Sequence, residues 1–339
     1  MTNLTLEFPA YLDPKREQIN CIAVTQEELM SHVFHDSRLA KGKSISSKRD
    51  LSNAQPRNSN AELAFIFHTA FCGSTFLARI LANVNAYHSI REPNVLMELA
   101  NMVRMNQKLS NDGFQVKRWL DTIFSSFLQL EKDKDENFSS QKMLLVKPTN
   151  AANNLIPVLL RNFPRSKSVF LYTSREDFLV SIIKKGEQGR NFVRHLYNVL
   201  SLDKSIYISQ DFRQANSLTD LQIACLVWTH QMSVYQACAT PVSGHTICFV
   251  EASEFLAEPE EYTQLISTFY GQPISEKIMC SLVNSGVFYR HSKDNNSKYS
   301  AQQRLLEKQQ VIDKYASELT SNEQWFNSLN IACFNPKEQ

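Results

Sequence analysis

Glycine is scarce in this chain, with 8 in 339 residues, and none of them forms a familiar nucleotide-binding pattern. A Walker A loop needs G-x-x-x-x-G-K-[S/T], and the dinucleotide fingerprint needs G-x-G-x-x-G. Neither spacing occurs in the sequence. We therefore do not expect an ordinary ATP or GTP hydrolase or a dinucleotide-binding turn.

Charge of one sign and long apolar runs are also missing. The net charge is only +2, which argues against broad nucleic-acid binding. No run reaches the ~20 apolar residues of a membrane span, and the first residues lack the basic start and apolar core of a secretory signal. We expect a cytoplasmic protein without a membrane span or a nucleic-acid partner.

Cysteine pairs and metal-ligand spacings are absent as well. The 7 cysteines are odd in number, widely spaced and never in a C-x-x-C pair, which fits reduced thiols in the cytoplasm. The 8 histidines show no metal-ligand spacing, so we expect no metal. The 43% hydrophobic content and the length are sufficient for one large core.

The most informative segment that is present covers residues 64–81, AFIFHTAFCGSTFLARIL. An apolar run breaks at a short polar turn, and apolar residues with helical spacing follow. This pattern predicts a strand, a loop and a helix N-terminus, where backbone N–H groups and the helix dipole favour a phosphate. Ser74 and Thr75 are suited to cap this helix or to donate to phosphate oxygens.

A second segment, residues 142–186, predicts a β-α-β unit. Strands are expected at residues 143–146 and 168–172, with a helix that ends at Phe163-Pro164 between them. Such a unit implies parallel strands and a right-handed crossover. Lys184-Lys185 lies near the proposed phosphate site and is the one notable basic pair.

Five motifs occur in an order that resembles the sulfotransferase superfamily, over roughly residues 61–271. They are Cys72-Gly73-Ser74-Thr75-Phe76, Arg91-Glu92-Pro93, Val146-Lys147-Pro148, Phe163-Pro164-x-x-Lys167 and Asp177-x-x-x-Ser181. The resemblance implies a P-loop NTPase-like sulfotransferase fold, which is a three-layer α/β domain whose mainly parallel sheet has helices on both faces. It also implies 3′-phosphoadenylyl sulfate (PAPS) as co-substrate.

The resemblance assigns donor-binding roles to two segments. Cys72, Gly73, Ser74, Thr75 and Phe76 are the expected cradle of the 5′-phosphosulfate. Ser181 matches the family's 3′-phosphate segment, and Arg175 stands two residues after the family's arginine position, which is Thr173 here. The family's basic residue before the first loop is replaced by Phe71. A late basic stretch adds Arg290 and Lys293 as weaker donor-binding candidates.

Three residues are candidates for the chemistry. Sulfuryl transfer needs a base for the acceptor proton and positive charge near the leaving phosphate oxygen. The resemblance implies Glu92 as the base, with a salt bridge to Arg91 or a helix start as the alternative interpretation. His68 is the competing base, or a histidine bonded to the backbone, and Lys147 is the candidate cation or a solvated strand end. We interpret Cys72 as a small loop residue, because no partner histidine is evident.

Residues 1–60 are expected to form a helical extension and a polar linker before a domain at residues 61–339. Thr25-Gln26-Glu27-Glu28 predicts a capping box for a helix to about Leu39, and residues 41–60 are polar. Helices are also expected at residues 97–130, at residues 221–238 and after Ser300, and a late strand at residues 246–250.

The sequence thus predicts transfer of a sulfuryl group from PAPS to a hydroxyl or amine of a small-molecule acceptor. A catalytically inactive nucleotide-binding or interaction protein on the same fold is one alternative. Another P-loop transferase such as a kinase is a second, although a loop lysine and an aspartate for Mg²⁺ are not well placed. The sequence does not indicate the acceptor or the oligomeric state.

Overall fold

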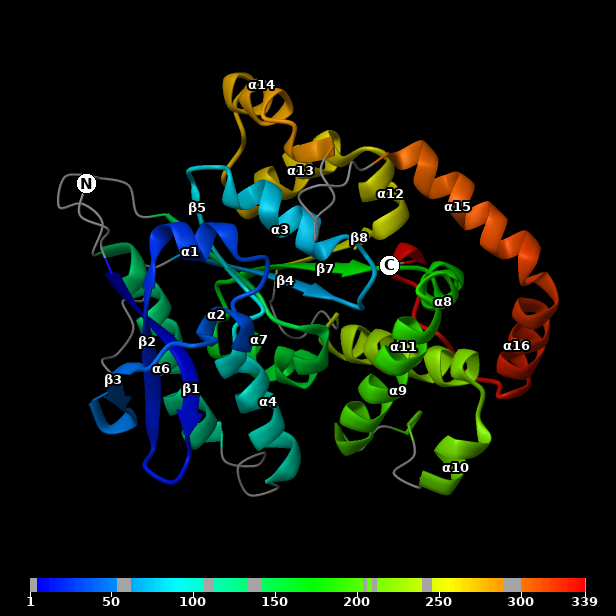
Figure 1. The fold of residues 1–339 in the computed structure, drawn as a ribbon, viewed down its shortest axis with the longest axis horizontal. Helices are drawn as coiled ribbons and strands as arrows, with labels where there is room; N and C mark the ends of the chain where they lie inside the picture. The colour runs from blue at the N-terminus through cyan, green and yellow to red at the C-terminus, as the bar shows by residue number, and fades with distance from the viewer. Residues whose placement is uncertain are drawn as a thin grey trace.

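A five-stranded parallel sheet forms the centre of the molecule, with strand order β5-β6-β4-β7-β8 (Figure 1). The computed structural model describes residues 5–53, 62–106, 113–132, 142–203, 206–208, 212–239, 246–289 and 300–338. The strands of the central sheet are β4 (Leu63–His68), β5 (Tyr87–Arg91), β6 (Met143–Lys147), β7 (Lys167–Tyr172) and β8 (Thr246–Glu251). Each neighbouring pair is parallel, which confirms the predicted sheet.

Strands β4, β6 and β7 are almost fully buried because helices cover both faces of the sheet, whereas the edge strand β8 is mostly half-exposed. In β4, Ala64 and Ile66 face one core while Phe65 and Phe67 face the other, as the two-residue repeat of a strand requires. The first core lies under α3 (Ser74–Ala82), α12 (Ala252–Ala257), α13 (Pro259–Tyr270) and α14 (Glu276–Asn284). The second lies under α4 (Asn94–Met105), α6 (Gly113–Lys132), α7 (Ile156–Asn162), α8 (Arg175–Lys184), α9 (Gly186–Leu200) and α11 (Asp220–Cys238). The predicted three layers are confirmed.

The order of the strands places a ligand site beside β4. The chain goes from β4 to the sheet edge at β5, and later continues from β6 to the opposite side of β4 at β7. In open parallel sheets, ligands bind outside the carboxyl ends of the strands at such a reversal. The loops after β4, β5 and β6 meet at this point.

The predicted helical extension at residues 1–60 is wrong in its secondary structure. An antiparallel three-stranded sheet, β1-β2-β3, occupies most of this part and packs against α4 and α6 (Figure 1). Its strands are β1 (Thr5–Asp13), β2 (Gln18–Thr25) and β3 (Ile45–Asp50). β3 is a polar edge strand with no buried residue. Its polar composition resembles that of a linker, which is why the sequence predicted a linker at this position.

The predicted capping box at Thr25 and Glu28 is present, but the helix it opens is short. α1 (Gln26–Ser31) ends at Ser31, and a second helix, α2 (Ser37–Ala40), begins after the Asp36 cap. Residues 32–36 connect the two and lie at the carboxyl end of β5, where His35 N–H donates to Arg91 O at 2.6 Å. The expected helix therefore breaks where the chain passes the site.

The C-terminal part forms two helices that lie on the far side of α8 from the central sheet (Figure 1). α15 (Ala301–Lys314) begins at the predicted Ser300 cap, and α16 (Ala316–Ser328) follows after a break at Tyr315. The structure also describes α10 (Phe212–Ser217). Among the described residues, no helix combines the length and the apolar character that crossing a bilayer requires.

Candidate functional site

A pocket of about 500 Å³ opens at the carboxyl ends of the strands, over the loop that joins β4 to α3. This volume is within the usual range for small-molecule sites. The lining comes from segments far apart in the sequence: Phe34, His68, Ala70, Phe71, Cys72, Gly73, Ser74, Thr75, Phe76, Glu92, Thr149, Asn150, Ser181, Lys184, Lys185, Phe192, Leu256 and Arg304. The structure thus brings the five predicted cradle residues together with His68, Glu92 and Ser181.

The loop after β4 has an unusual backbone. Ala70, Phe71 and Gly73 all have φ in the left-handed region, at 77°, 52° and 76°. Such angles cost free energy in residues other than glycine and are concentrated at functional sites. A Cβ atom at Gly73 would lie 3.0 Å from Leu256 Cδ2, so glycine here avoids both the cost of the left-handed conformation and a tight contact. The scarce glycine noted in the sequence therefore has a structural reason.

The N-terminus of α3 forms the wall of the pocket. Gly73 is the N-cap and no side chain caps the helix, so the cap predicted for Ser74 or Thr75 does not form. The first-turn N–H groups of a helix have no acceptor within the helix, and the dipole there is positive. Ser74 and Thr75 line the pocket instead. The arrangement suits an anion such as phosphate.

Cys72 is not activated as a nucleophile. Its side chain is buried, and burial raises the pKa of the thiol above its ordinary value. This agrees with the interpretation of Cys72 as a small loop residue.

Glu92 projects from the end of β5 in a strained conformation. Its φ is 52°, and its N–H donates to Lys147 O at 2.6 Å, so the neighbouring strand fixes this backbone. Glu92 also precedes Pro93, which restricts the residue before it. A non-glycine residue in the left-handed region costs about 1–3 kcal/mol and persists only where surrounding contacts hold it. The alternative salt bridge between Glu92 and Arg91 does not form, because Glu92 pairs with Lys147.

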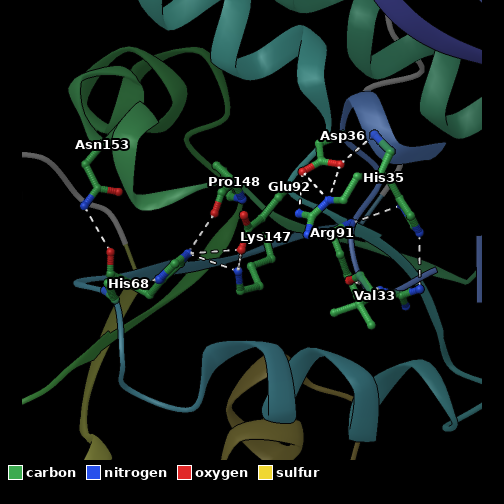
Figure 2. Close-up of polar contacts among 11 residues, drawn as sticks. Val33, His35, Asp36, His68, Arg91, Glu92, Lys147, Pro148 and Asn153 are labelled. Atoms are coloured by element: carbon green, nitrogen blue, oxygen red, sulfur yellow. Dashed lines mark hydrogen bonds and ion pairs between the residues drawn. The ribbon is translucent and has the colours of Figure 1, made fainter. Parts of the chain in front are cut away.

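Lys147 contacts two residues that line the pocket, Glu92 and His68 (Figure 2). Its side chain is 1% exposed, and Nζ lies 2.5 Å from Glu92 Oε1 and 3.0 Å from His68 Nε2. It is therefore not a solvated strand end. Lys147 does not line the pocket itself, so its influence on a bound ligand passes through Glu92 and His68, which do.

The ring of His68 is held from both sides. Nε2 lies 3.2 Å from Pro148 O, and Nδ1 lies 3.3 Å from the backbone N of Ala70. A neutral imidazole has one N–H, so the ring either donates to Pro148 and accepts from Ala70, or accepts from Lys147 through Nε2. Each arrangement fixes the ring beside Glu92, whose Oε1 is 3.9 Å from Nε2.

Basic residues from α8 and α15 also line the pocket. Ser181, Lys184 and Lys185 lie at the end of α8, and Arg304 reaches the same wall from α15. Lys185 Nζ lies 5.6 Å from the centre of the Phe71 ring, so a cation accompanies the residue that replaces the family's basic one. Sequence reasoning missed Arg304, since no motif links residue 304 to the loop.

Two residues of the predicted 3′-phosphate segment have other partners. Arg175 is not among the lining residues: it pairs with Glu323 at 2.5 Å and lies over the Phe326 ring of α16. Asp177 contacts Lys308 Nζ at 2.6 Å, which attaches α15 to α8. Ser181 therefore lines the pocket, whereas Arg175, on the same helix, does not.

Thr173 has a structural role in the strand ends. Its N–H donates to Thr69 Oγ1 at 3.2 Å, and its carbonyl accepts from Trp228 Nε1 at 2.8 Å. Arg290 and Lys293 lie outside the described residues. Across the described ranges, no group of histidine, cysteine, aspartate and glutamate residues is arranged to hold a metal ion.

No family model and no curated protein matches the chain. Among solved structures, it is similar to the sulfotransferase domain of the olefin synthase from Synechococcus PCC 7002, at 14% identity and a TM-score of 0.43, over 77% of this chain and 97% of that one. It is also similar to a sulfotransferase from Mycobacterium avium, at 10% identity and a TM-score of 0.41, over 77% of this chain and 76% of that one.

A third similar structure is retinol dehydratase in complex with androsterone and the inactive cofactor PAP, at 12% identity and a TM-score of 0.38, over 98% of this chain and 100% of that one. The solved structures that the chain resembles thus include the family that its motifs predict. At these identities and scores, we base the function on the residues of the pocket.

Proposed function

We propose that this protein transfers a sulfuryl group from PAPS to a hydroxyl or amine of a small acceptor. The observation that carries the proposal is the placement of Glu92 in the same pocket as the α3 N-terminus and the basic cluster of Lys184, Lys185 and Arg304. The pocket thus offers a base together with two sets of anion-binding groups.

The residues of the pocket fit the two phosphorylated ends of the donor. The amides of the α3 N-terminus, with Ser74 and Thr75, suit the 5′-phosphosulfate. Ser181, Lys184 and Arg304 suit the 3′-phosphate, in place of the arginine that Thr173 does not supply. When bound, PAPS supplies the sulfuryl group and a phosphate leaving group.

Glu92 is the residue we assign as the general base. Its ion pair with Lys147 involves the carboxylate form, and its side chain is 17% exposed, so it is open to the acceptor. The acceptor oxygen or nitrogen would give its proton to Glu92 and form a bond to the donor sulfur, while the bond from that sulfur to the phosphate oxygen breaks and adenosine 3′,5′-bisphosphate leaves. Lys147 and His68 hold the carboxylate in place, and the α3 amides with Lys185 stabilise charge on the leaving oxygen.

A turnover assay tests this function. The protein is incubated with PAPS and a pool of small alcohols and amines, and release of adenosine 3′,5′-bisphosphate and sulfated products is measured by mass spectrometry. Acceptor-dependent release that is lost in Glu92→Gln supports the proposal. Binding of the bisphosphate without release favours the nucleotide-binding protein, while phosphorylation of an acceptor by ATP favours a kinase.

A further inference from the structure

The N-terminal unit contributes to the pocket, although it precedes the central sheet in the chain. Phe34, in the link between α1 and α2, lines the pocket together with Glu92. Its ring centre lies 5.9 Å from Lys147 Nζ and 4.3 Å from the Arg38 guanidinium. Glu92 also contributes to raising the pKa of Arg38, after the larger effect of Asp36, which places Arg38 within electrostatic reach of the candidate base.

Arg91 connects this link to the candidate base. Its side chain is among the largest fully buried ones in the described part of the chain, yet its guanidinium is directed to backbone carbonyls of the N-terminal unit (Figure 2). The acceptors are the carbonyls of Leu29 at 2.6 Å, His32 at 2.7 Å, Val33 at 3.3 Å and Met30 at 3.4 Å. These contacts come from Nε and Nη2, so the planar guanidinium holds its N–H groups against several carbonyls of this link at once.

His35 holds the same two segments through the backbone. Its N–H donates to Arg91 O at 2.6 Å, while its Nδ1 accepts from the Arg91 N–H at 3.2 Å. The other ring nitrogen donates to Leu29 O at 2.9 Å. These bonds fix the backbone of Arg91 on both sides, and Glu92 is the next residue.

We propose that Phe34, carried by the segment of residues 29–38, forms the acceptor-side wall of the pocket and is a specificity-determining residue, with Arg91 and His35 as positioning residues. The inference rests on the proposed function, since it names the wall against which the acceptor binds. Arg91 and His35 act by holding Phe34 and Glu92 in a fixed relation.

The chemistry of this wall indicates the class of acceptor. Phe34 presents an apolar surface beside the carboxylate, and Phe71, Phe76 and Phe192 line the same pocket. An alcohol on a flat apolar body places its hydroxyl at Glu92 and its body against Phe34. Aromatic contacts of this kind contribute about 0.5–1.5 kcal/mol beyond the area they bury.

Binding of 2-naphthol, an aromatic alcohol, tests the role of Phe34. Its Kd is measured by fluorescence with and without adenosine 3′,5′-bisphosphate, for the wild type, Phe34→Ala and Phe34→Tyr. The matched control is Phe114→Ala, because Phe114 is 71% exposed on α6 and lies outside the pocket. We expect Phe34→Ala to weaken 2-naphthol binding about tenfold, Phe34→Tyr to retain it, and the bisphosphate Kd to stay within about twofold in all variants.

Arg91→Lys and His35→Gln test the positioning role. We expect both to weaken 2-naphthol binding about threefold or more and to accelerate amide hydrogen exchange in residues 29–38, with α13 exchange and bisphosphate binding unchanged. A purely structural role would lower the thermal midpoint and change both ligands together. If either variant does not fold, the 2-naphthol Kd values of Phe34→Ala and Phe34→Tyr test the inference.

Two results would overturn the inference: no binding of 2-naphthol by the wild type, or the same Kd in Phe34→Ala as in the wild type. Failure of the proposed function has a different signature, because the wild type would then not bind the bisphosphate. If the wild type does not bind the bisphosphate but its Kd for 2-naphthol still depends on Phe34, the proposed function fails and Phe34 still belongs to a site for an apolar alcohol.

Discussion

Lys147 Nζ lies 2.5 Å from Glu92 Oε1, although the two residues are 55 positions apart in the sequence. Lys147 is the last residue of β6, and Glu92 directly follows the neighbouring parallel strand β5. The register of β5 and β6 pairs Arg91 with Lys147, which places Glu92 just beyond the strand end and above the lysine. This ion pair links the candidate base to the sheet, and the following predictions start from it.

Replacing Glu92 with glutamine should remove turnover and keep donor binding. The amide has nearly the same shape but does not accept a proton, and general base catalysis contributes roughly 10²–10⁴-fold. We expect the rate of sulfuryl transfer to fall by about that factor, with the bisphosphate Kd unchanged in calorimetry. Glu276→Gln, an exposed substitution on α14, is the matched control and should have wild-type activity. Retained turnover in Glu92→Gln would assign the base elsewhere.

Replacing Lys147 with methionine should destabilise the fold, because it leaves a partly buried carboxylate without its partner. Breaking a buried pair costs about 3 kcal/mol, and the partial exposure of Glu92 places the effect at or below that value. We expect Lys147→Met/Glu92→Gln to recover part of the lost free energy of unfolding in urea. Additive effects of the two substitutions would contradict the coupling.

Replacing Gly73 with alanine should affect both stability and the donor. Gly73 has φ +76°, and the new Cβ would contact Leu256 and Phe255 at 3.0 and 3.2 Å. Gly42→Ala is a matched control, because Gly42 has the same φ of +76° with nothing within 4 Å of its Cβ position. Both variants should lose about 1 kcal/mol from backbone strain, and only Gly73→Ala should also weaken bisphosphate binding. Equal behaviour of the two would mean that the loop is not the cradle.

High salt should weaken the attachment of α15 to α8. This helix has no buried residue, and Lys308 pairs with Asp177 at 2.6 Å and Glu176 at 2.9 Å. The Debye length falls from about 10 Å at 0.1 M to about 3 Å at 1 M, so the pair with Glu176, whose side chain is 61% exposed, weakens more than the pair with the buried Asp177. We expect faster hydrogen exchange in α15 at 1 M salt, and in Lys308→Gln at 0.1 M. Salt-independent exchange would show that other contacts hold the helix.

Acid should destabilise the protein through His35. Burial, and next the charge of Arg91, lower the pKa of His35 well below its ordinary value of 6.5, with smaller effects from His88 and His32. The unfolded chain therefore binds a proton below about pH 6.5 that the folded chain excludes, so stability is complete above that pH and falls below it. Protonation of one group changes the free energy of unfolding by at most about 1.4 kcal/mol per pH unit. His35→Gln should show a smaller loss between pH 7 and 5.5 in urea unfolding, and an unchanged slope would contradict the assignment.

The central sheet was predictable because its strands are apolar runs followed by polar residues, and because β-α-β order restricts the topology. The predicted strand ends agree within a residue or two at β4, β6 and β7. The N-terminal sheet was not predictable, since the exposed strand β3 is polar and the capping box at Thr25 opens a helix of only 6 residues.

The candidate site was likewise predictable only in part. The loop and Glu92 follow from local motifs, because a strand end and a helix start fix their positions. Arg304 and Phe34 depend on how distant helices pack, and no local pattern records that packing. Arg175 has the expected residue type in nearly the expected place, but Glu323 and Phe326 attract its guanidinium to α16.

A calorimetric titration with adenosine 3′,5′-bisphosphate, with ADP as control, tests the central claim most directly. The pocket has anion-binding groups at two places, so we predict clear preference for the bisphosphate, loss of that preference in Lys184→Ala/Arg304→Ala, and weaker binding in Gly73→Ala. Equal affinity for both nucleotides, or no binding of either, would contradict a PAPS site in this pocket.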